Sequence, residues 1–170
     1  TLINSLLNDN SVLISNEVIK PRAEILSQNL SKWGNSNTAV TNSDPVVFSK
    51  LQEVFDVIVA DVPCSGSGLF RKQPDAIEEW SENNVNLCST RQKRILGDVL
   101  NSLKANGILI YSTCSYSIEE NEMITEWLIK DFNLELVPIP FDKDSGITDT
   151  GLGYRFYPYS TKSEGFFCAV

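Results

Sequence analysis

The sequence predicts an α/β domain with a doubly wound, mostly parallel sheet and an antiparallel last strand. The first observation is that short β-rich runs alternate with longer amphipathic helical runs, which is the pattern of a parallel sheet covered by helices. The second is that the closing run "EGFFCAV" has no helix before it, so it can join the sheet in the antiparallel direction. The third is the length of 170 residues, which suits one domain.

The first half of the chain reads as strand, helix, strand. Residues 11–17, "SVLISNE", predict a strand, and residues 38–42, "TAVTN", predict a second one. Between them, apolar residues recur every three or four positions and a glycine follows the last of them, which predicts an amphipathic helix and its end. These residues are Ala23, Leu26, Leu30, Trp33 and Gly34.

The second half continues the alternation. "FDVIVAD" (55–61) is apolar enough to predict a strand buried on both faces, and "GILIYST" (107–113) predicts the next strand. A long helix from Glu82 to Lys104 lies between them, with a core-facing stripe of Val85, Cys88, Ile95, Leu96, Val99 and Leu103.

Three further elements complete the chain. Ser117 and Glu120 fit an S-x-x-E capping box that opens a helix whose apolar face is Met123, Ile124, Trp127 and Leu128. "LELVPI" (134–139) predicts a strand, and residues 140–153 predict a long exposed loop, because they are rich in Gly, Asp and Pro.

Composition excludes several classes of protein. The chain is 42% hydrophobic and 21% charged, and none of its apolar runs approaches the roughly 20 residues that span a membrane. It contains no histidine, which excludes Ser-His-Asp and Cys-His nucleophile pairs within it. The net charge of -8 argues against gripping nucleic acid by bulk electrostatics, although "FRKQP" (70–74) and "RQKR" (91–94) are local basic clusters.

The four cysteines do not form a zinc motif or a disulfide framework. They are widely separated, without a Cys-x-x-Cys pair or a histidine to complete a metal site. No secretory signal is visible, so we expect reduced thiols, a cytoplasmic protein and no bound metal. Cys88 belongs to a helical apolar stripe and is interpreted as packing.

Candidate functional residues follow the predicted strands, where ligands of open α/β sheets bind. Glu17 is an acceptor suited to ribose hydroxyls, or else a solvated carboxylate at a helix entry; Asp44 follows the next strand. Asp61 and Cys64 flank Pro63, which fixes the backbone before a "SGSG" turn. Cys114 also follows a strand directly, and a thiol in a polar loop is more often reactive than packing.

Two of these stretches, "DVPCSGSGLFRKQPDAIEEW" and "STCSYSIEENE", resemble the Asp-x-Pro-Cys and Thr-Cys-Ser motifs of the Nop/Sun family of S-adenosylmethionine-dependent RNA cytosine-5 methyltransferases. The resemblance extends through "SNEVIKPRAEILSQNLSKWGNSN", "TNSDP" and "YRFYPYSTKSEGFF". "GLFRKQP" and "RQKRIL" look most like the bacterial F-type branch of this family, whose members are named after the small ribosomal subunit. The family implies a Rossmann-like class I methyltransferase fold over residues 1–170.

The resemblance also implies roles for individual residues. Glu17 would bind the ribose of S-adenosylmethionine and Asp44 its adenine edge. Asp61 would lie near both the cofactor and the target base, where, if protonated, it would act as a catalytic residue by donating a hydrogen bond to the ring. Cys114 would be the nucleophile that adds to carbon 6 of cytosine, and Cys64 would help remove the carbon 5 proton and release the adduct. The RNA would be single-stranded, or its cytidine flipped, and Pro63 and Arg155 would contact it, unless Arg155 is an exposed structural arginine.

Two departures from the family pattern bear on these expectations. "TLINSLLN" looks like the helix after the family's first strand and glycine-rich loop, so we expect the chain to begin after both and to bind S-adenosylmethionine poorly on its own. Tyr159 stands where the family often has histidine. Two alternatives stay open: a non-catalytic RNA-binding or scaffold module with this fold, and an exocyclic-nitrogen methyltransferase, which would not need a thiol at position 114.

Overall fold

The computed structural model describes the backbone of residues 1–170 and the side chains of residues 1–142 and 144–170. The chain forms two compact units, Thr1–Val47 and Phe48–Val170. Unit 1 contains α1 (Leu2–Ser5), β1 (Leu13–Asn16), α2 (Lys20–Trp33), β2 (Thr38–Thr41) and the start of η1 (Pro45–Lys50). Unit 2 contains β3 (Phe55–Asp61), η2 (Ser67–Leu69), α3 (Ala76–Glu79), α4 (Glu82–Leu100), β4 (Leu103–Thr113), η3 (Ile118–Glu120), α5 (Glu122–Phe132), η4 (Lys143–Ser145), β5 (Thr148–Asp149), β6 (Tyr154–Phe156) and β7 (Phe166–Ala169).

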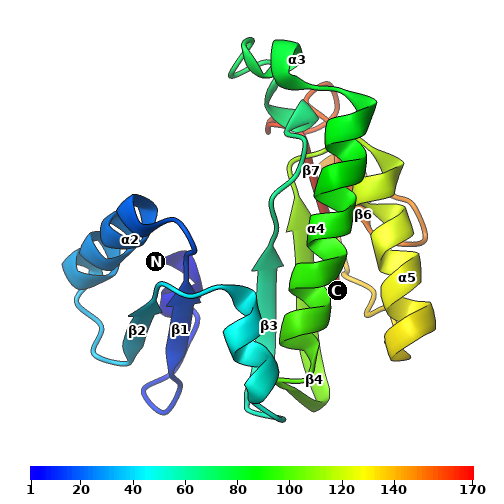
Figure 1. Cartoon of the computed structure of the whole chain (residues 1–170). Coiled ribbons are helices and arrows are strands. Elements are labelled where there is room, and N and C mark those ends of the chain that lie inside the picture. Colours follow the sequence, from blue (N-terminus) through cyan, green and yellow to red (C-terminus); the bar gives the residue numbers. More distant parts are fainter. The chain divides into compact units, whose positions relative to one another are not determined.

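Unit 1 is a strand, helix, strand unit, as the sequence predicts. β1 and β2 pair in parallel, in register from Leu13 with Thr38 to Asn16 with Thr41, and α2 connects them (Figure 1). The helix ends at Gly34, which adopts a left-handed conformation (φ 82°) that glycine reaches without a steric penalty. Ala23 and Leu30 are buried, whereas Trp33, expected on the same apolar face, is exposed.

Unit 2 is built on a five-stranded mixed sheet with the strand order β3-β4-β7-β6-β5. β3 and β4 are parallel, and the other neighbours pair antiparallel, so the predicted mostly parallel sheet is wrong for this unit. The reason is that β5, β6 and β7 follow one another through loops, and a parallel pair would need a crossover connection between them. The predicted antiparallel last strand is confirmed: β7 pairs with β4.

The core of unit 2 lies between one face of this sheet and the two long helices α4 and α5 (Figure 1). Leu96 and Ile124 are fully buried there, and the ring of Tyr111 meets Phe167 edge to face, 6.2 Å between centroids. Cys88 is buried on α4, as expected for a packing residue. Met123, predicted on the apolar face of the last helix, is half exposed instead.

β3 is not buried on both faces. Ala60 faces the helices and is buried, but Val57 and Val59 on the other face are 50% and 45% exposed. Both α4 and α5 contribute to the core on the Ala60 side, and β3 is an edge strand of the five-stranded sheet. An apolar strand is buried on both faces only when helices cover both faces of the sheet. The prediction from the sequence therefore overestimated the burial of β3.

Two predicted boundaries also differ from the structure. The helix expected to reach Lys104 ends at Leu100, because the Ser102 carbonyl accepts from the Val54 and Phe55 amides at 2.8 Å and starts the pairing of β4 with β3. The run 134–139 is not a strand; its Val137 amide donates to the Val170 carbonyl at 2.8 Å. The predicted loop 140–153 contains η4 and the two-residue strand β5.

Candidate active site

The site of unit 2 begins where β3 and β4 end. The two strands are parallel neighbours, with Asp61 in register with Ser112, so the loops that follow both start at the same edge of the sheet. Cys64 and Cys114 lie in these two loops, and their Sγ atoms are 3.1 Å apart. The structure therefore brings together the two thiols that the sequence singled out, although 50 residues separate them along the chain.

Backbone hydrogen bonds hold the two loops in contact. The Gly68 amide donates to the Cys114 carbonyl at 2.8 Å, and the Gly165 amide donates to the Gly68 carbonyl at 3.0 Å. A Cβ atom on Gly68 would lie 2.7 Å from the Cys114 carbonyl oxygen and 2.5 Å from that of Gly165. Glycine is required at position 68 for this close approach, which also gives the predicted "SGSG" turn a structural reason.

The thiol pair is electrostatically asymmetric. The hydrogen bond from Cys64 lowers the pKa of Cys114, against the opposing effects of burial and of the Asp61 and Glu120 charges. The same hydrogen bond, together with burial and the charge on Cys114, raises the pKa of Cys64. Of the two groups, Cys114 is therefore the one that ionises first, and Cys64 stays a thiol that donates to it.

Glu120 cross-links the two loops from a buried position. Its carboxylate accepts from the Ser65 amide at 2.7 Å, from Ser65 Oγ at 2.6 Å and from Ser115 Oγ at 2.5 Å. The predicted capping box is therefore wrong: Ser117 precedes η3 without a side-chain cap bond, and the Glu120 side chain is directed to the cysteine loops. Sequence reasoning missed this role because S-x-x-E fits a cap equally well.

Two more buried polar residues support the same loops. Gln92 Nε2, from α4, donates to the Pro63 carbonyl at 3.0 Å, and its Oε1 lies 3.0 Å from the Tyr111 hydroxyl. That hydroxyl also contacts the Glu120 carbonyl. Burial raises the pKa of Tyr111, so it is a neutral donor. The sequence signal for this hydrogen-bond network was Gln92, a glutamine in the middle of the apolar face of α4.

Asp61 and Pro63 flank the first thiol. Asp61 is exposed at the end of β3 and accepts from Ser112 Oγ at 3.0 Å, while its charge acts on the pKa of Cys114. The Pro63 ring is also exposed. Both residues are therefore accessible beside the thiol pair, and their roles toward cofactor and RNA remain predictions.

Arg155 is placed differently from what the sequence suggested. It is buried in β6, where its Nε donates to Glu122 Oε1 at 2.6 Å and its Nη1 donates to the Tyr116 carbonyl at 2.9 Å. The bond of the guanidinium to the Tyr116 carbonyl holds the loop after Cys114 in place. Its predicted contact with RNA receives no support from these bonds, and the alternative of an exposed structural arginine is wrong because the residue is only 6% exposed.

The predicted cofactor residues Glu17 and Asp44 lie in unit 1, at the carboxyl ends of β1 and β2. Glu17 Oε1 accepts from the Ile19 amide at 2.9 Å, and its Oε2 pairs with Arg22 Nε at 3.1 Å. Asp44 Oδ1 accepts from the Val46 amide at 3.1 Å. Both are carboxylates that a donor hydroxyl or amino group could approach, so their chemistry fits a nucleoside cofactor.

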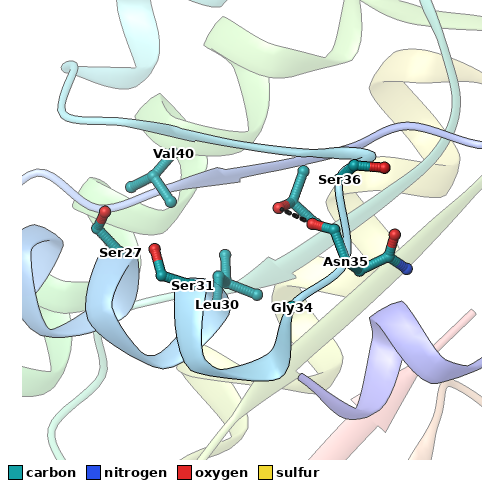
Figure 2. Close-up of a pocket in the computed structure, with 8 residues that line it drawn as sticks. Ser27, Leu30, Ser31, Gly34, Asn35, Ser36 and Val40 are labelled. Atoms are coloured by element: carbon teal, nitrogen blue, oxygen red, sulfur yellow. Dashed lines mark hydrogen bonds between the residues drawn. The ribbon is translucent and has the colours of Figure 1, made fainter.

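A hollow of about 420 Å³ in unit 1 lies away from these carboxylates. Figure 2 shows its lining between the second half of α2 and the start of β2, where Thr38 Oγ1 donates to the Asn35 carbonyl at 3.1 Å. This is the amino end of the strands, and ligands of parallel sheets bind at the carboxyl end. We assign it no function.

The described part of the chain offers neither a cluster of metal ligands nor a helix suited to crossing a membrane. Among residues 1–142 and 144–170, no three Cys, Asp or Glu residues are grouped as metal ligands. Over the same residues, none of the helices combines the length and the apolar character that crossing a bilayer requires.

Solved structures that are similar to the chain include two from Pyrococcus horikoshii. NSun6 from Pyrococcus horikoshii, solved with SFG, matches with a TM-score of 0.85 and 27% identity, over 98% of this chain and 42% of that one. A methyltransferase homolog protein from Pyrococcus horikoshii matches with a TM-score of 0.78 and 30% identity, over 93% and 52% of the two chains. Together with the paired thiols, this defines the class: an α/β methyltransferase.

The comparison of sequences specifies the family. The family model described as 16S rRNA methyltransferase RsmB/F matches residues 1–170. Proteins named ribosomal RNA small subunit methyltransferase F, from Salmonella arizonae and Salmonella paratyphi B, are 37% and 36% identical over 99% of this chain. The chain belongs to the RsmB/F family of S-adenosylmethionine-dependent RNA cytosine-5 methyltransferases. It spans 36% of the length of these relatives.

Proposed function

We propose that this chain is the catalytic domain of a cytoplasmic enzyme that methylates carbon 5 of a cytosine in ribosomal RNA, on a Rossmann-like class I methyltransferase fold. The single observation that carries the proposal is the pair of thiols, 3.1 Å apart at the ends of two parallel strands, with pKa values shifted in opposite directions. Ribosomal RNA as the substrate rests on the names of the relatives.

The first step uses the thiolate of Cys114. Its sulfur adds to carbon 6 of the cytosine, and the electron pair of the carbon 5–carbon 6 double bond moves toward carbon 5, which becomes nucleophilic. S-adenosylmethionine, when bound, supplies the electrophilic methyl group that carbon 5 takes. Cys114 suits this role because a hydrogen bond from Cys64 stabilises its thiolate.

Cys64 serves the second half of the reaction. Its pKa is raised first by its hydrogen bond to Cys114, then by burial and by the charge of that thiolate. Once the Cys114 sulfur is bonded to carbon 6, the thiolate is consumed, and only burial still raises the pKa of Cys64. Cys64 then releases its own proton to water, and its thiolate takes the carbon 5 proton, while the carbon–hydrogen electron pair restores the double bond and expels the Cys114 thiolate.

The cofactor would be held by acceptors at strand ends. Glu17 suits the ribose hydroxyls, which are donors, and Asp44 suits the amino edge of adenine. Asp61 is exposed beside the thiols and is assigned to the cofactor and the target base. Each assignment rests on the chemistry of a carboxylate at the carboxyl end of a strand and on the family resemblance.

Transfer of labelled methyl from S-adenosylmethionine to 16S ribosomal RNA by the complete gene product tests the proposal. We expect Cys114→Ala to reduce transfer to background and Cys64→Ala to accumulate a covalent protein–RNA adduct. Cys88→Ala, which removes a buried packing thiol on α4, is the matched control and should keep activity. Full activity in Cys114→Ala would refute the nucleophile, and a label mapped to the exocyclic nitrogen would refute the reaction.

A further inference from the structure

Three tyrosine rings form a column that begins beside the proposed nucleophile. Tyr116 stacks on Tyr157, with 5.7 Å between ring centroids and 22° between planes, and Tyr157 stacks on Tyr159 at 5.2 Å and 16°. Tyr116 is two residues after Cys114. At the other end of the column, Tyr159 is 84% exposed, so one face of a flat ring is open to solvent.

The inner ring is fixed to the loops of the active site. The Tyr116 amide donates to Ser67 Oγ at 2.8 Å, and its carbonyl accepts from Arg155 Nη1 at 2.9 Å. Its hydroxyl packs against Gly165, where an added Cβ atom would lie 2.3 Å from that oxygen. Gly165 in turn binds Gly68, the residue that holds the Cys114 carbonyl.

The outer part of the column is shaped by a turn. The Tyr157 carbonyl accepts from the Ser160 amide at 3.0 Å and from the Thr161 amide at 2.8 Å, which sets the direction of the backbone through Tyr159. Arg71, from the loop of the first thiol, donates to the Ser163 carbonyl at 3.1 Å and pairs with Glu164 at 2.9 Å, tying the following residues to the same loop. The column is therefore preorganised before any ligand arrives.

An exposed ring at the end of such a column suits a nucleobase. Proteins that bind single-stranded RNA stack unpaired bases on aromatic side chains, and every base offers a flat face for this. A cytosine that leaves its helix to reach Cys114 leaves neighbouring bases without their stacking partner. The occupant we favour over a protein partner is RNA, because the column is bonded to the loops where an RNA base would react.

We propose that the outer face of Tyr159 binds an unpaired nucleobase of the substrate RNA, next to the cytidine that reacts with Cys114. The proposal rests on the proposed function and assigns part of the substrate site to residues 116, 157 and 159. Stacking alone would make the site tolerant of the base identity. The stacked rings would thereby position the RNA strand, and selection of a particular RNA sequence would come from other contacts.

Binding of a single-stranded RNA oligonucleotide to the complete gene product tests the proposal. The oligonucleotide carries one cytidine with 2-aminopurine on either side, and the measurements are its dissociation constant and its fluorescence quenching. Tyr159→Ala should weaken binding about tenfold and remove the quenching, in line with the loss of one stacked base. Tyr159→Phe keeps the ring and should bind within about twofold of the unmodified protein.

The outcomes separate this proposal from the proposed function. Tyr159 is exposed, so the melting temperature and the affinity for S-adenosylmethionine should not change in either variant. Binding by Tyr159→Ala equal to that of the unmodified protein would overturn the stacking site and leave the ring to a protein partner. The RNA measurement needs no methyl transfer, so an inactive enzyme that still loses RNA affinity in Tyr159→Ala would contradict only the proposed function.

Discussion

Cys64 and Cys114 are the same chemical group in neighbouring loops, yet their surroundings shift their pKa values in opposite directions. The difference comes from the hydrogen bond that the two thiols share, which lowers the pKa of Cys114 and raises that of Cys64. The division of labour between nucleophile and proton acceptor therefore depends on the pair, and replacing either thiol should change the behaviour of the other.

The pH dependence of thiol alkylation tests this coupling. Because the pKa of Cys114 is lowered, its thiolate should form and react with iodoacetamide at lower pH than a free cysteine. In Cys64→Ala the largest contribution that lowers the pKa of Cys114 is lost, while burial and the Asp61 and Glu120 charges still raise it, so the alkylation midpoint should move to higher pH. Mass spectrometry of the Cys114 peptide gives the midpoint; an unchanged value would show that the thiols are not coupled.

Glu120→Gln tests the cross-link between the loops. The glutamine amide keeps one oxygen acceptor, but its NH2 group is a donor and would face a donor of Ser65 or Ser115. We therefore expect methyl transfer to fall and the free energy of unfolding to drop by about 2 kcal/mol. Loss of the negative charge should at the same time lower the alkylation midpoint of Cys114. Glu119→Gln, at the exposed neighbouring position, is the control, and equal effects of the two changes would contradict the assignment.

How much of the site was readable from the sequence depends on the residue. Both reactive cysteines follow strands and could be identified from that position, because parallel strands end at one edge. Glu120, Gln92 and Tyr111 could not be identified, since their roles depend on which side chains meet in the buried space between loops 50 residues apart. Arg155 was placed on the surface because its partner Glu122 is 33 residues away in the chain.

At the scale of elements, the loops after β3 and β4 depend on how closely their backbones approach. Gly68→Ala should break the contact between them, because its Cβ would lie 2.5 to 2.7 Å from two carbonyl oxygens that cannot move independently. We expect loss of methyl transfer and a lower melting temperature.

Gly97→Ala is a matched control for that change. Gly97 lies in α4, and a Cβ there meets nothing within 4 Å, so the alanine should raise the free energy of unfolding by about 1 kcal/mol through helix propensity. Differential scanning fluorimetry compares the two variants. Similar shifts of the melting temperature in both variants would mean that the loops relax and relieve the clash at position 68.

The elements themselves were predicted with uneven success. Strands 11–17 and 38–42 and the helix between them are confirmed, because alternation and a glycine stop are local signals. The end of α4 and the loss of the 134–139 strand were not predictable, since both depend on long-range partners: the Ser102 carbonyl binds Val54, and Val137 binds Val170.

For the whole molecule, the distribution of buried apolar residues predicts different local stabilities in the two units. Unit 2 has a ten-residue buried cluster, whereas the buried aliphatic residues of unit 1, within the described part of the chain, are Ala23, Leu30 and Pro45. Amides of β4 and β7, which have strands on both sides, should exchange with deuterium most slowly. Amides of β1 and β2 should exchange earlier; equally slow exchange in hydrogen-exchange mass spectrometry would contradict this.

The distance between the two sulfurs also has a consequence for handling the protein. At 3.1 Å the two sulfurs are about 1 Å farther apart than in a disulfide bond, so a small loop movement would let them bond. A mild peroxide would form this bond by taking up both thiol hydrogens, and it would itself be reduced to water. A sample stored without a reductant would then look folded and inactive, and dithiothreitol should restore it. Any assay of this chain is therefore also an assay of its redox state.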